Sequence, residues 1–290
     1  MITRVRIVTA VCVLTAALSA LAACAGPEEP GVMRAPRPAP SASAVSPVPP
    51  AAKPPTLAPG PAGLTPVFEH GPRTGGKAVA LTFDADMTAD QGLRARRGER
   101  FDNPGLVAAL RALEVPATVF MTGRWAEEYP RQARAIGRDP LFEVANHSYS
   151  HYAFTDDCYG LPTLPEKRMR ADVERAYAAF RKVGVRNPMP YFRFPGGCYD
   201  RRALKALTPV GVTAVQWDVV SADAFATDAG AVAREVLDGV RAGSVVVMHC
   251  TRSAAPTTER AVRRIVPELR EKGFRFVKVS ELIGAAGGRA

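Results

Sequence analysis

The chain has 290 residues, 47% of them hydrophobic, and a formal net charge of +10. This length allows one sizeable domain with additional segments, and the hydrophobic content allows a real core. The positive charge favours anionic surroundings such as nucleic acid, phospholipid or an acidic cell-wall polymer. Because no basic stretch is interleaved with aromatic residues, and because an export signal comes first, we expect no nucleic-acid partner.

Residues 1–23 have the layout of a secretory signal peptide. Arg4 and Arg6 precede an apolar stretch that ends in small residues before Cys24. This ending resembles a bacterial lipobox, which implies that Cys24 becomes the lipidated first residue of the mature protein. The alternative is a transmembrane anchor, although the run is slightly shorter than the ~20 residues usually needed. Either interpretation predicts an extracytoplasmic domain, attached to the cell membrane by lipid in the first case and secreted if no anchor is attached.

Residues 24–66 have the composition of a flexible linker. The stretch 25–66 holds 13 of the 26 prolines, with alanine and serine between them. Such a composition buries too little apolar surface to fold, and its prolines keep the chain extended. We therefore expect a spacer, followed by one globular domain over residues 67–290.

From residue 67 onward, short β-branched runs alternate with helical patterns. Asn103 and Pro104 have the residue types of an N-cap and a first helical position. The patterns predict strands at 77–84, 117–123, 141–148, 191–194, 213–220, 243–250 and 274–280, and helices at 103–114, 124–137, 165–183, 200–207, 228–241 and 257–272. This alternation predicts an α/β domain with a mainly parallel sheet, either open or closed into a barrel.

Polar residues gather where the predicted strands end. Active sites of parallel α/β sheets and barrels lie at the carboxyl ends of strands. Five strands each deliver such residues, which predicts an active site at this edge. The residues are Asp84, Asp86, His147, Arg193, Asp218, Ser221, Asp223 and His249.

These residues fall within motifs that resemble those of the NodB-homology polysaccharide deacetylases, carbohydrate esterase family four. The motifs are LTFDAD (81–86), NHSYSH (146–151), RFPGG (193–197) and VVMHC (246–250), and the resemblance covers about residues 75–283. The fourth family motif is degraded, with only Asp223 of VSADA (220–224) matching. The resemblance implies a distorted (β/α) barrel of mainly parallel strands and a metal-dependent deacetylase.

A divalent metal is expected at two histidines. His147 and His151 are four residues apart, so a helical turn or a tight loop would let both hold one metal. The family has a metal-binding aspartate after the catalytic one, and here that position is Ala85. Because side chains alternate along a strand, Asp84 and Asp86 should face the same way, and we expect Asp86 to supply the third ligand. The alternative is a two-histidine site completed by water. The mixed ligands suit zinc, with cobalt or nickel as alternatives.

The resemblance implies the other roles. Asp84 matches the catalytic base, His249 the general acid, and Arg193 the residue that orients Asp84, while Asp223 matches a catalytic motif aspartate. Pro195 and Gly197 are expected to shape a loop at the substrate, and Trp217 to form an apolar wall for a sugar ring.

Two loops near the active edge carry further features. Cys158 and Cys198 are expected to lie close together, so we predict that they form a disulfide. The segment 87–102 is rich in arginine and is either a groove for an anionic polymer or a solvated basic loop.

The main expectation is a deacetylase that removes N-acetyl groups from cell-wall or surface polysaccharide, with peptidoglycan N-acetylglucosamine favoured. The alternatives are a catalytically inactive glycan-binding lipoprotein on the same fold and an acetyl-xylan-type esterase, because fold does not fix substrate. We expect the chain to act as a monomer.

Overall fold

The computed structural model describes residues 53–186 and 188–287, and within these residues one sheet has nine strands. The strand order is β1-β6-β5-β4-β3-β2-β8-β7, with β9 also paired to β2, and every pairing is parallel. The strands are β1 (Val67–Phe68), β2 (Ala78–Ala85), β3 (Ala117–Met121), β4 (Phe142–Asn146), β5 (Tyr191–Phe192), β6 (Thr213–Val215), β7 (Val219–Val220), β8 (Ser244–His249) and β9 (Arg275–Phe276).

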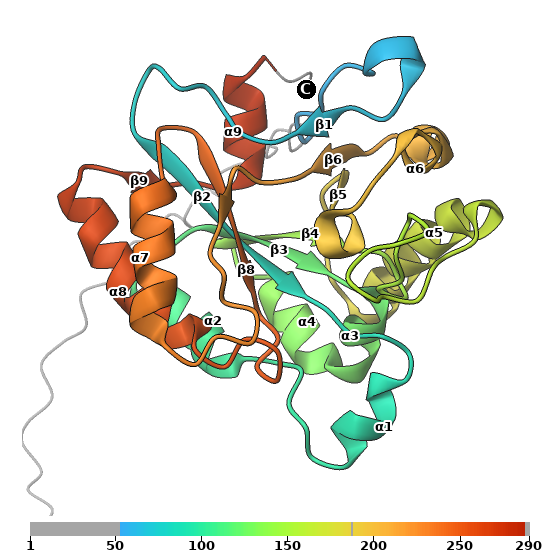
Figure 1. Cartoon of the computed structure of the whole chain (residues 1–290), viewed down its shortest axis with the longest axis horizontal. Coiled ribbons are helices and arrows are strands. Elements are labelled where there is room, and N and C mark those ends of the chain that lie inside the picture. Colours follow the sequence, from blue (N-terminus) through green and yellow to red (C-terminus); the bar gives the residue numbers. More distant parts are fainter. Residues whose placement is uncertain (1–52, 187, 288–290) are drawn as a thin grey trace, which may run out of the picture. The chain divides into compact units, whose positions relative to one another are not determined.

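Helices surround the sheet (Figure 1). They are α1 (Gln91–Arg96), α2 (Pro104–Ala112), α3 (Gly123–Glu128), α4 (Pro130–Ile136), α5 (Glu166–Val183), α6 (Arg201–Leu207), α7 (Ala229–Gly239), α8 (Thr258–Glu271) and α9 (Val279–Ala285). As predicted, Pro104 opens α2, and the Asn103 side chain caps it by accepting a hydrogen bond from the backbone N–H of Leu106.

The sheet curls into a distorted (β/α) barrel, which confirms the expected fold class. The single strand predicted at 213–220 is wrong, because this segment forms two strands, β6 and β7. β6 pairs with β5 and β1, whereas β7 pairs with β8 near the other end of the strand order. Residues 216–218 therefore cross between the two ends of the sheet. Gly71 N–H also donates to Gly243 O at 2.8 Å, which joins the chain after β1 to the turn before β8.

Three further predicted elements differ from the structure. The helix predicted at 124–137 is divided into α3 and α4, because Pro130 cannot continue the first helix and instead begins the second. The strand predicted at 191–194 ends at Phe192, and the one predicted at 274–280 ends at Phe276, after which α9 begins at Val279.

The two faces of β2 differ. Val79, Leu81 and Phe83 belong to the large apolar cluster that includes side chains of the helices, whereas Ala80 belongs to a smaller cluster with Phe120. The smaller cluster draws on β1 to β6 and β8, so it fills the inside of the barrel. Asp84 lies an even number of residues from Ala80 and therefore faces the inside, at the carboxyl end of the strand.

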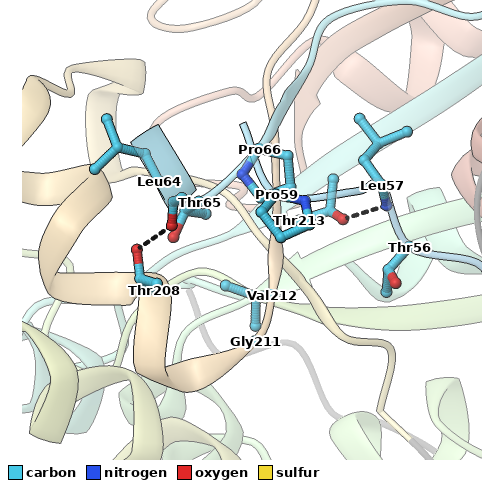
Figure 2. Close-up of a pocket in the computed structure, with 11 residues that line it drawn as sticks. Thr56, Leu57, Pro59, Leu64, Thr65, Pro66, Thr208, Gly211, Val212 and Thr213 are labelled. Carbon is cyan, nitrogen blue, oxygen red and sulfur yellow. Dashed lines mark hydrogen bonds between the residues drawn. The ribbon is translucent and has the colours of Figure 1, made fainter. Parts of the chain in front are cut away.

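The last part of the predicted linker is folded against the domain. Leu57 N–H donates to Thr213 Oγ1 at 3.1 Å, and the Tyr191 hydroxyl donates to Pro55 O at 2.8 Å. Figure 2 shows the cavity of about 140 Å³ between residues 56–66 and residues 208–213, which none of the predicted site residues lines. Residues 53–66 are thus part of the domain rather than of a spacer.

The predicted signal peptide (1–23), Cys24 and the first part of the linker lie outside the described residues. Among the helices that the structure describes, none is both long and apolar enough to cross a membrane.

Candidate active site

Four parallel strands bring the motif residues to one edge of the sheet. Asp84 on β2 is in register with His249 on β8, so these two side chains come from directly neighbouring positions. Asn146 on β4 is in register with Phe192 on β5. The residues that follow them, His147 and Arg193, therefore lie side by side just beyond the carboxyl ends of these strands. The predicted gathering of polar residues at the carboxyl ends of strands is therefore observed.

Asp84 and Arg193 form a buried ion pair. Arg193 Nη1 donates to Asp84 Oδ1 at 2.7 Å, and the side chains are 0% and 6% exposed. The guanidinium also lies 3.9 Å from the centre of the Phe120 ring, which fixes its plane. Burial by itself would raise the pKa of Asp84, but the charge and hydrogen bond of Arg193, together with the nearby His147 and His249, outweigh burial and hold this pKa below its usual range. Asp84 is therefore a carboxylate at neutral pH.

His147 presents a lone pair toward Asp84. Its Nδ1 lies 2.9 Å from Arg193 O, and a carbonyl oxygen can only accept, so Nδ1 carries the proton. Burial keeps the pKa of His147 below its usual range, so the ring is neutral and Nε2 is unprotonated. Nε2 lies 3.7 Å from Asp84 Oδ2. Two acceptors that face each other at this distance leave room for a cation between them.

His151 and Asp86 form a second histidine–carboxylate pair, with 3.6 Å between Nε2 and Oδ2. The two histidine rings have their centres 5.0 Å apart. A tight loop joins them, with positive φ at Ser148 and His151 and a hydrogen bond of 2.9 Å from His151 N–H to Ser148 Oγ. Burial lowers the pKa of His151 to about 4, so at neutral pH this ring too is an uncharged potential ligand.

Strand alternation explains how Asp86 reaches this pair. Ala85 is 0% exposed and packs in the large apolar cluster with Phe83 and Met87. Asp84 and Asp86 lie toward the histidines instead. Thr251 Oγ1 donates a hydrogen bond to Asp86 Oδ1 and so orients this carboxylate.

The chemistry of these donors fits a divalent metal. Imidazole nitrogen and carboxylate oxygen are the usual ligands of catalytic zinc, and two ligands of one tetrahedral zinc lie ~3.3 Å apart for bonds of about 2.0–2.1 Å. The two pairs, at 3.7 and 3.6 Å, are near that separation. Within residues 53–186 and 188–287, no three His, Cys, Asp or Glu side chains meet in a complete metal-binding geometry.

His249 is held by Asp223. Its Nδ1 lies 2.8 Å from Asp223 Oδ1, and its backbone N–H donates to Oδ2 at 2.7 Å. Ser221 and Thr258 hydroxyls also donate to this carboxylate. Burial by itself would lower the pKa of His249, but the charge of Asp223 raises it to about 10. The imidazole is thus a cation at neutral pH, and its side chain, 26% exposed, is more accessible than Asp84.

Asp218, the other candidate acid in this region, lies elsewhere. It accepts hydrogen bonds of 2.8 Å from Arg73 and from the Ser244 hydroxyl, and so ties the segment before β2 to the start of β8. Asp218 therefore has a structural role, and Asp223 is the aspartate that lies in the candidate site.

The RFPGG loop packs between Trp217 and a disulfide. Gln216 Nε2 donates to Gly197 O at 2.7 Å. Gly197 has a φ of +76°, and a Cβ there would lie 2.4 Å from Trp217, so only glycine fits. Cys158 and Cys198 form the predicted disulfide, which joins the loops that follow β4 and β5. Pro195 is buried beside this bridge, with its carbonyl 3.6 Å from Cys158 Sγ.

Sequence reasoning missed Thr251 and Thr258. Both supply hydroxyls that hold site carboxylates, yet Ser and Thr are too common to stand out. Thr251 lies two residues after His249 and could have been found by strand alternation. Thr258 is the first residue of α8, and nothing local indicates its contact with Asp223.

Comparison with known proteins gives consistent matches. Residues 71–215, half of the chain, match the model of the polysaccharide deacetylase family. A chitooligosaccharide deacetylase of Azorhizobium caulinodans is 26% identical, over 59% of this chain and 83% of the relative. A peptidoglycan-N-acetylglucosamine deacetylase of Bacillus cereus is 25% identical, over 71% of this chain and 88% of the relative. The solved structure of a Bacillus anthracis pseudoenzyme of carbohydrate esterase family four shares the fold, with a TM-score of 0.61 at 22% identity over 79% of this chain and 70% of that chain.

Proposed function

Because the chain belongs to the polysaccharide deacetylase family, we propose that it removes N-acetyl groups from a cell-wall or surface glycan, with peptidoglycan N-acetylglucosamine as the favoured substrate. One observation carries the proposal. An ionised carboxylate, Asp84, and a protonated imidazole, His249, occupy neighbouring positions of adjacent strands. Amide hydrolysis needs such a base and such an acid together.

The two groups have complementary tasks. Asp84 accepts a proton from the attacking water, whose oxygen bonds to the acetyl carbon, and Arg193 keeps this carboxylate ionised and oriented. His249 donates its proton to the departing nitrogen as the carbon–nitrogen bond breaks. Acetate and a free amine on the sugar result. Asp223 stabilises the imidazolium before transfer and fixes the ring through Nδ1, so that Nε2 faces the substrate.

His147, His151 and Asp86 would hold a divalent metal, with zinc favoured over cobalt or nickel. When bound, the metal polarises the amide carbonyl and lowers the pKa of water. The hydrogen bond of His147 Nδ1 to Arg193 O fixes the tautomer that leaves Nε2 free to bind it. Pro195, Gly197 and Trp217 would form the wall beside the sugar. Trp217 is only partly buried, with Gly197 packed beside its six-membered ring and the Arg193 guanidinium carbon 5.4 Å from its ring centre.

The N-terminal pattern supports a location for this activity. We propose that the chain is exported, that Cys24 carries a lipid that holds it at the cell membrane, and that the proline-rich segment lets the domain reach the glycan. Mass spectrometry of the membrane fraction tests this, because a Cys24→Ala variant should appear in the soluble extracellular fraction.

Acetate release by the whole chain tests the activity. The substrates are peptidoglycan fragments, chitin oligomers and acetylated xylan, each with added zinc or cobalt, and Asp84→Asn is the matched control. Metal-dependent acetate that disappears in Asp84→Asn supports the proposal and ranks the substrates. Acetate from xylan alone would identify an esterase instead.

A second function is favoured by one observation, the replacement of the family's metal-binding aspartate by Ala85. A protein that binds glycan without turnover would need no catalytic metal. Glycan binding with no acetate from any substrate in the presence of zinc would favour this alternative.

A further inference from the structure

A cavity of about 400 Å³ lies beside the loop that joins the two site histidines. It is lined by Tyr149, Ser150 and Tyr152 of this loop and by Arg168, Asp172 and Arg175 of α5, which packs against the loop. None of these residues has a part in the mechanism above. A ligand in this cavity would touch the loop between His147 and His151 and would thus be separated from the two histidines only by this loop.

The two arginines of this cavity share one face of α5. Arg168, Asp172 and Arg175 are spaced four and three residues apart, the spacing of helix neighbours. The described residues include no ion-pair partner for either guanidinium, whereas Arg170, on another face of the same helix, pairs with Glu174 at 2.7 Å. Both exposed guanidiniums are thus available to a ligand.

The negative charge of Asp172 is already used within the protein. Its Oδ2 accepts hydrogen bonds from the backbone N–H groups of Tyr149, at 2.7 Å, and Ser150, at 3.2 Å. This carboxylate fixes the histidine loop against α5. The charged side chains of the lining are two guanidiniums and this one carboxylate, so the cavity has an excess of positive charge beside its aromatic residues.

Arg175 is held in place by one of these aromatic residues. Its guanidinium carbon lies 3.6 Å from the centre of the Tyr149 ring, and the Tyr149 hydroxyl in turn donates to Glu127 Oε2 at 2.7 Å. A stacked guanidinium has lost much of its freedom before a ligand arrives, so less entropy is lost on binding. Its N–H groups remain at the ring edge, where they can form two parallel hydrogen bonds to a carboxylate.

We propose that this cavity binds a carboxylate carried by the glycan, on the sugar next to the one that loses its acetyl group. The inference rests on the proposed function for the glycan, and it adds that the preferred glycan is acidic. A carboxylate of this kind can be the lactyl group of muramic acid or the carboxyl group of a uronic acid. Both present the same planar anion to Arg168 and Arg175.

Binding is measured by calorimetry with the whole chain as the Asp84→Asn variant, which prevents turnover. The probes are three tetrasaccharides: neutral chitotetraose, a peptidoglycan tetrasaccharide with lactyl groups, and one that alternates N-acetylglucosamine with glucuronic acid. At low salt we expect at least one acidic probe to bind about tenfold more tightly than the neutral one. This preference should shrink as salt is added, because the guanidiniums are exposed.

Substitutions in α5 test whether this cavity causes the preference for acidic glycan. Arg168→Gln and Arg175→Gln should each reduce the ratio of acidic to neutral affinity about threefold to tenfold, and Arg175→Lys should restore it only in part. Arg181→Gln, on the same helix but outside the cavity, should leave the ratio unchanged. Equal affinity for acidic and neutral probes, or a ratio that Arg168→Gln and Arg175→Gln leave intact, overturns the inference. Because binding is read without turnover, this result is distinct from a failure to release acetate.

Discussion

Arg193 Nη1 and Asp84 Oδ1 are joined by a buried hydrogen bond of 2.7 Å although the two residues are 109 positions apart in the chain. The bond connects the end of β5 to the end of β2 across the inside of the barrel. It stabilises the charge of the proposed base and also ties two strands that are not neighbours in the sheet, so its loss should be visible in folding as well as in activity.

Replacing Arg193 by Ala should lower the free energy of unfolding by about 3–5 kcal/mol, because a buried carboxylate is left without its partner. Urea denaturation measures this. Arg170→Ala, which breaks the exposed pair with Glu174, should change it by at most about 0.5 kcal/mol. If both variants lost the same small amount of unfolding free energy, Arg193 and Asp84 would not form a buried ion pair.

The same pair predicts acid sensitivity. The pKa of Asp84 is lower in the folded protein than its ordinary value. Its contribution to stability is therefore complete above the ordinary pKa and is lost as the pH falls through the folded value. The free energy of unfolding of the wild type should fall more steeply below about pH 4 than that of Asp84→Asn. Unfolding free energies of the two proteins that fall in parallel with pH would contradict the lowered pKa of Asp84.

His249 should remain protonated far above neutral pH. Asp223 raises its pKa to about 10, so its contribution to stability is complete below the ordinary pKa near 6.5 and is lost as the pH rises through about 10. Histidine NMR on metal-free protein, with His249→Gln for assignment, should show this titration. Asp223→Asn should lower the pKa of His249 by roughly two units or more. A wild-type signal that titrates near pH 6.5 would contradict the assignment.

Restoring the family aspartate at Ala85 should harm this protein. Ala85 is 0% exposed within the apolar cluster, so an aspartate there would be buried without a partner. Ala85→Asp should cost at least about 3 kcal/mol of stability and should not improve zinc binding. Thermal unfolding and zinc titration check this, with the smaller Ala85→Ser as control. A stable Ala85→Asp protein with tighter zinc binding would mean that β2 can turn this position toward the histidines.

Thr251 should support metal binding through Asp86. Removal of the hydroxyl in Thr251→Val leaves the shape of the side chain but takes away the donor that orients the carboxylate. Zinc affinity should fall about tenfold or more. Calorimetric zinc titration of the metal-free chain measures it, and Thr208→Val, at an exposed threonine, should have no effect. Unchanged affinity in Thr251→Val together with unchanged affinity in Asp86→Asn would remove Asp86 from the ligand set.

The disulfide should stabilise the loops around the RFPGG segment. Cys158 and Cys198 are 40 residues apart, and a closed loop of that length contributes about 4 kcal/mol in the chain-entropy model. The double serine variant should lose roughly this amount in urea denaturation, and the reduced wild type should match it. Non-reducing peptide mapping that finds both thiols free would contradict the bridge.

The local signals in the sequence determined the class of fold and most members of the site. Alternating runs predicted a mainly parallel sheet, and the resemblance to the family added the barrel. Asn103 and Pro104 marked the start of α2, and the period of two along β2 predicted that Asp84 and Asp86 share a side and Ala85 does not. These features depend on neighbours in the chain, because backbone geometry fixes which side chains share a face.

Only the tertiary structure decided which distant groups meet. The run 213–220 has the β-branched and aromatic residues of one strand, yet its two halves pair at different places in the sheet because β1 and β5 accept one half and β8 the other. That division directs Asp218 to Arg73 and Asp223 to His249. Thr251 and Thr258 likewise gain their roles from carboxylates far away in the chain. Such contacts depend on the assembly of the whole sheet, a non-local event that no short segment encodes by itself.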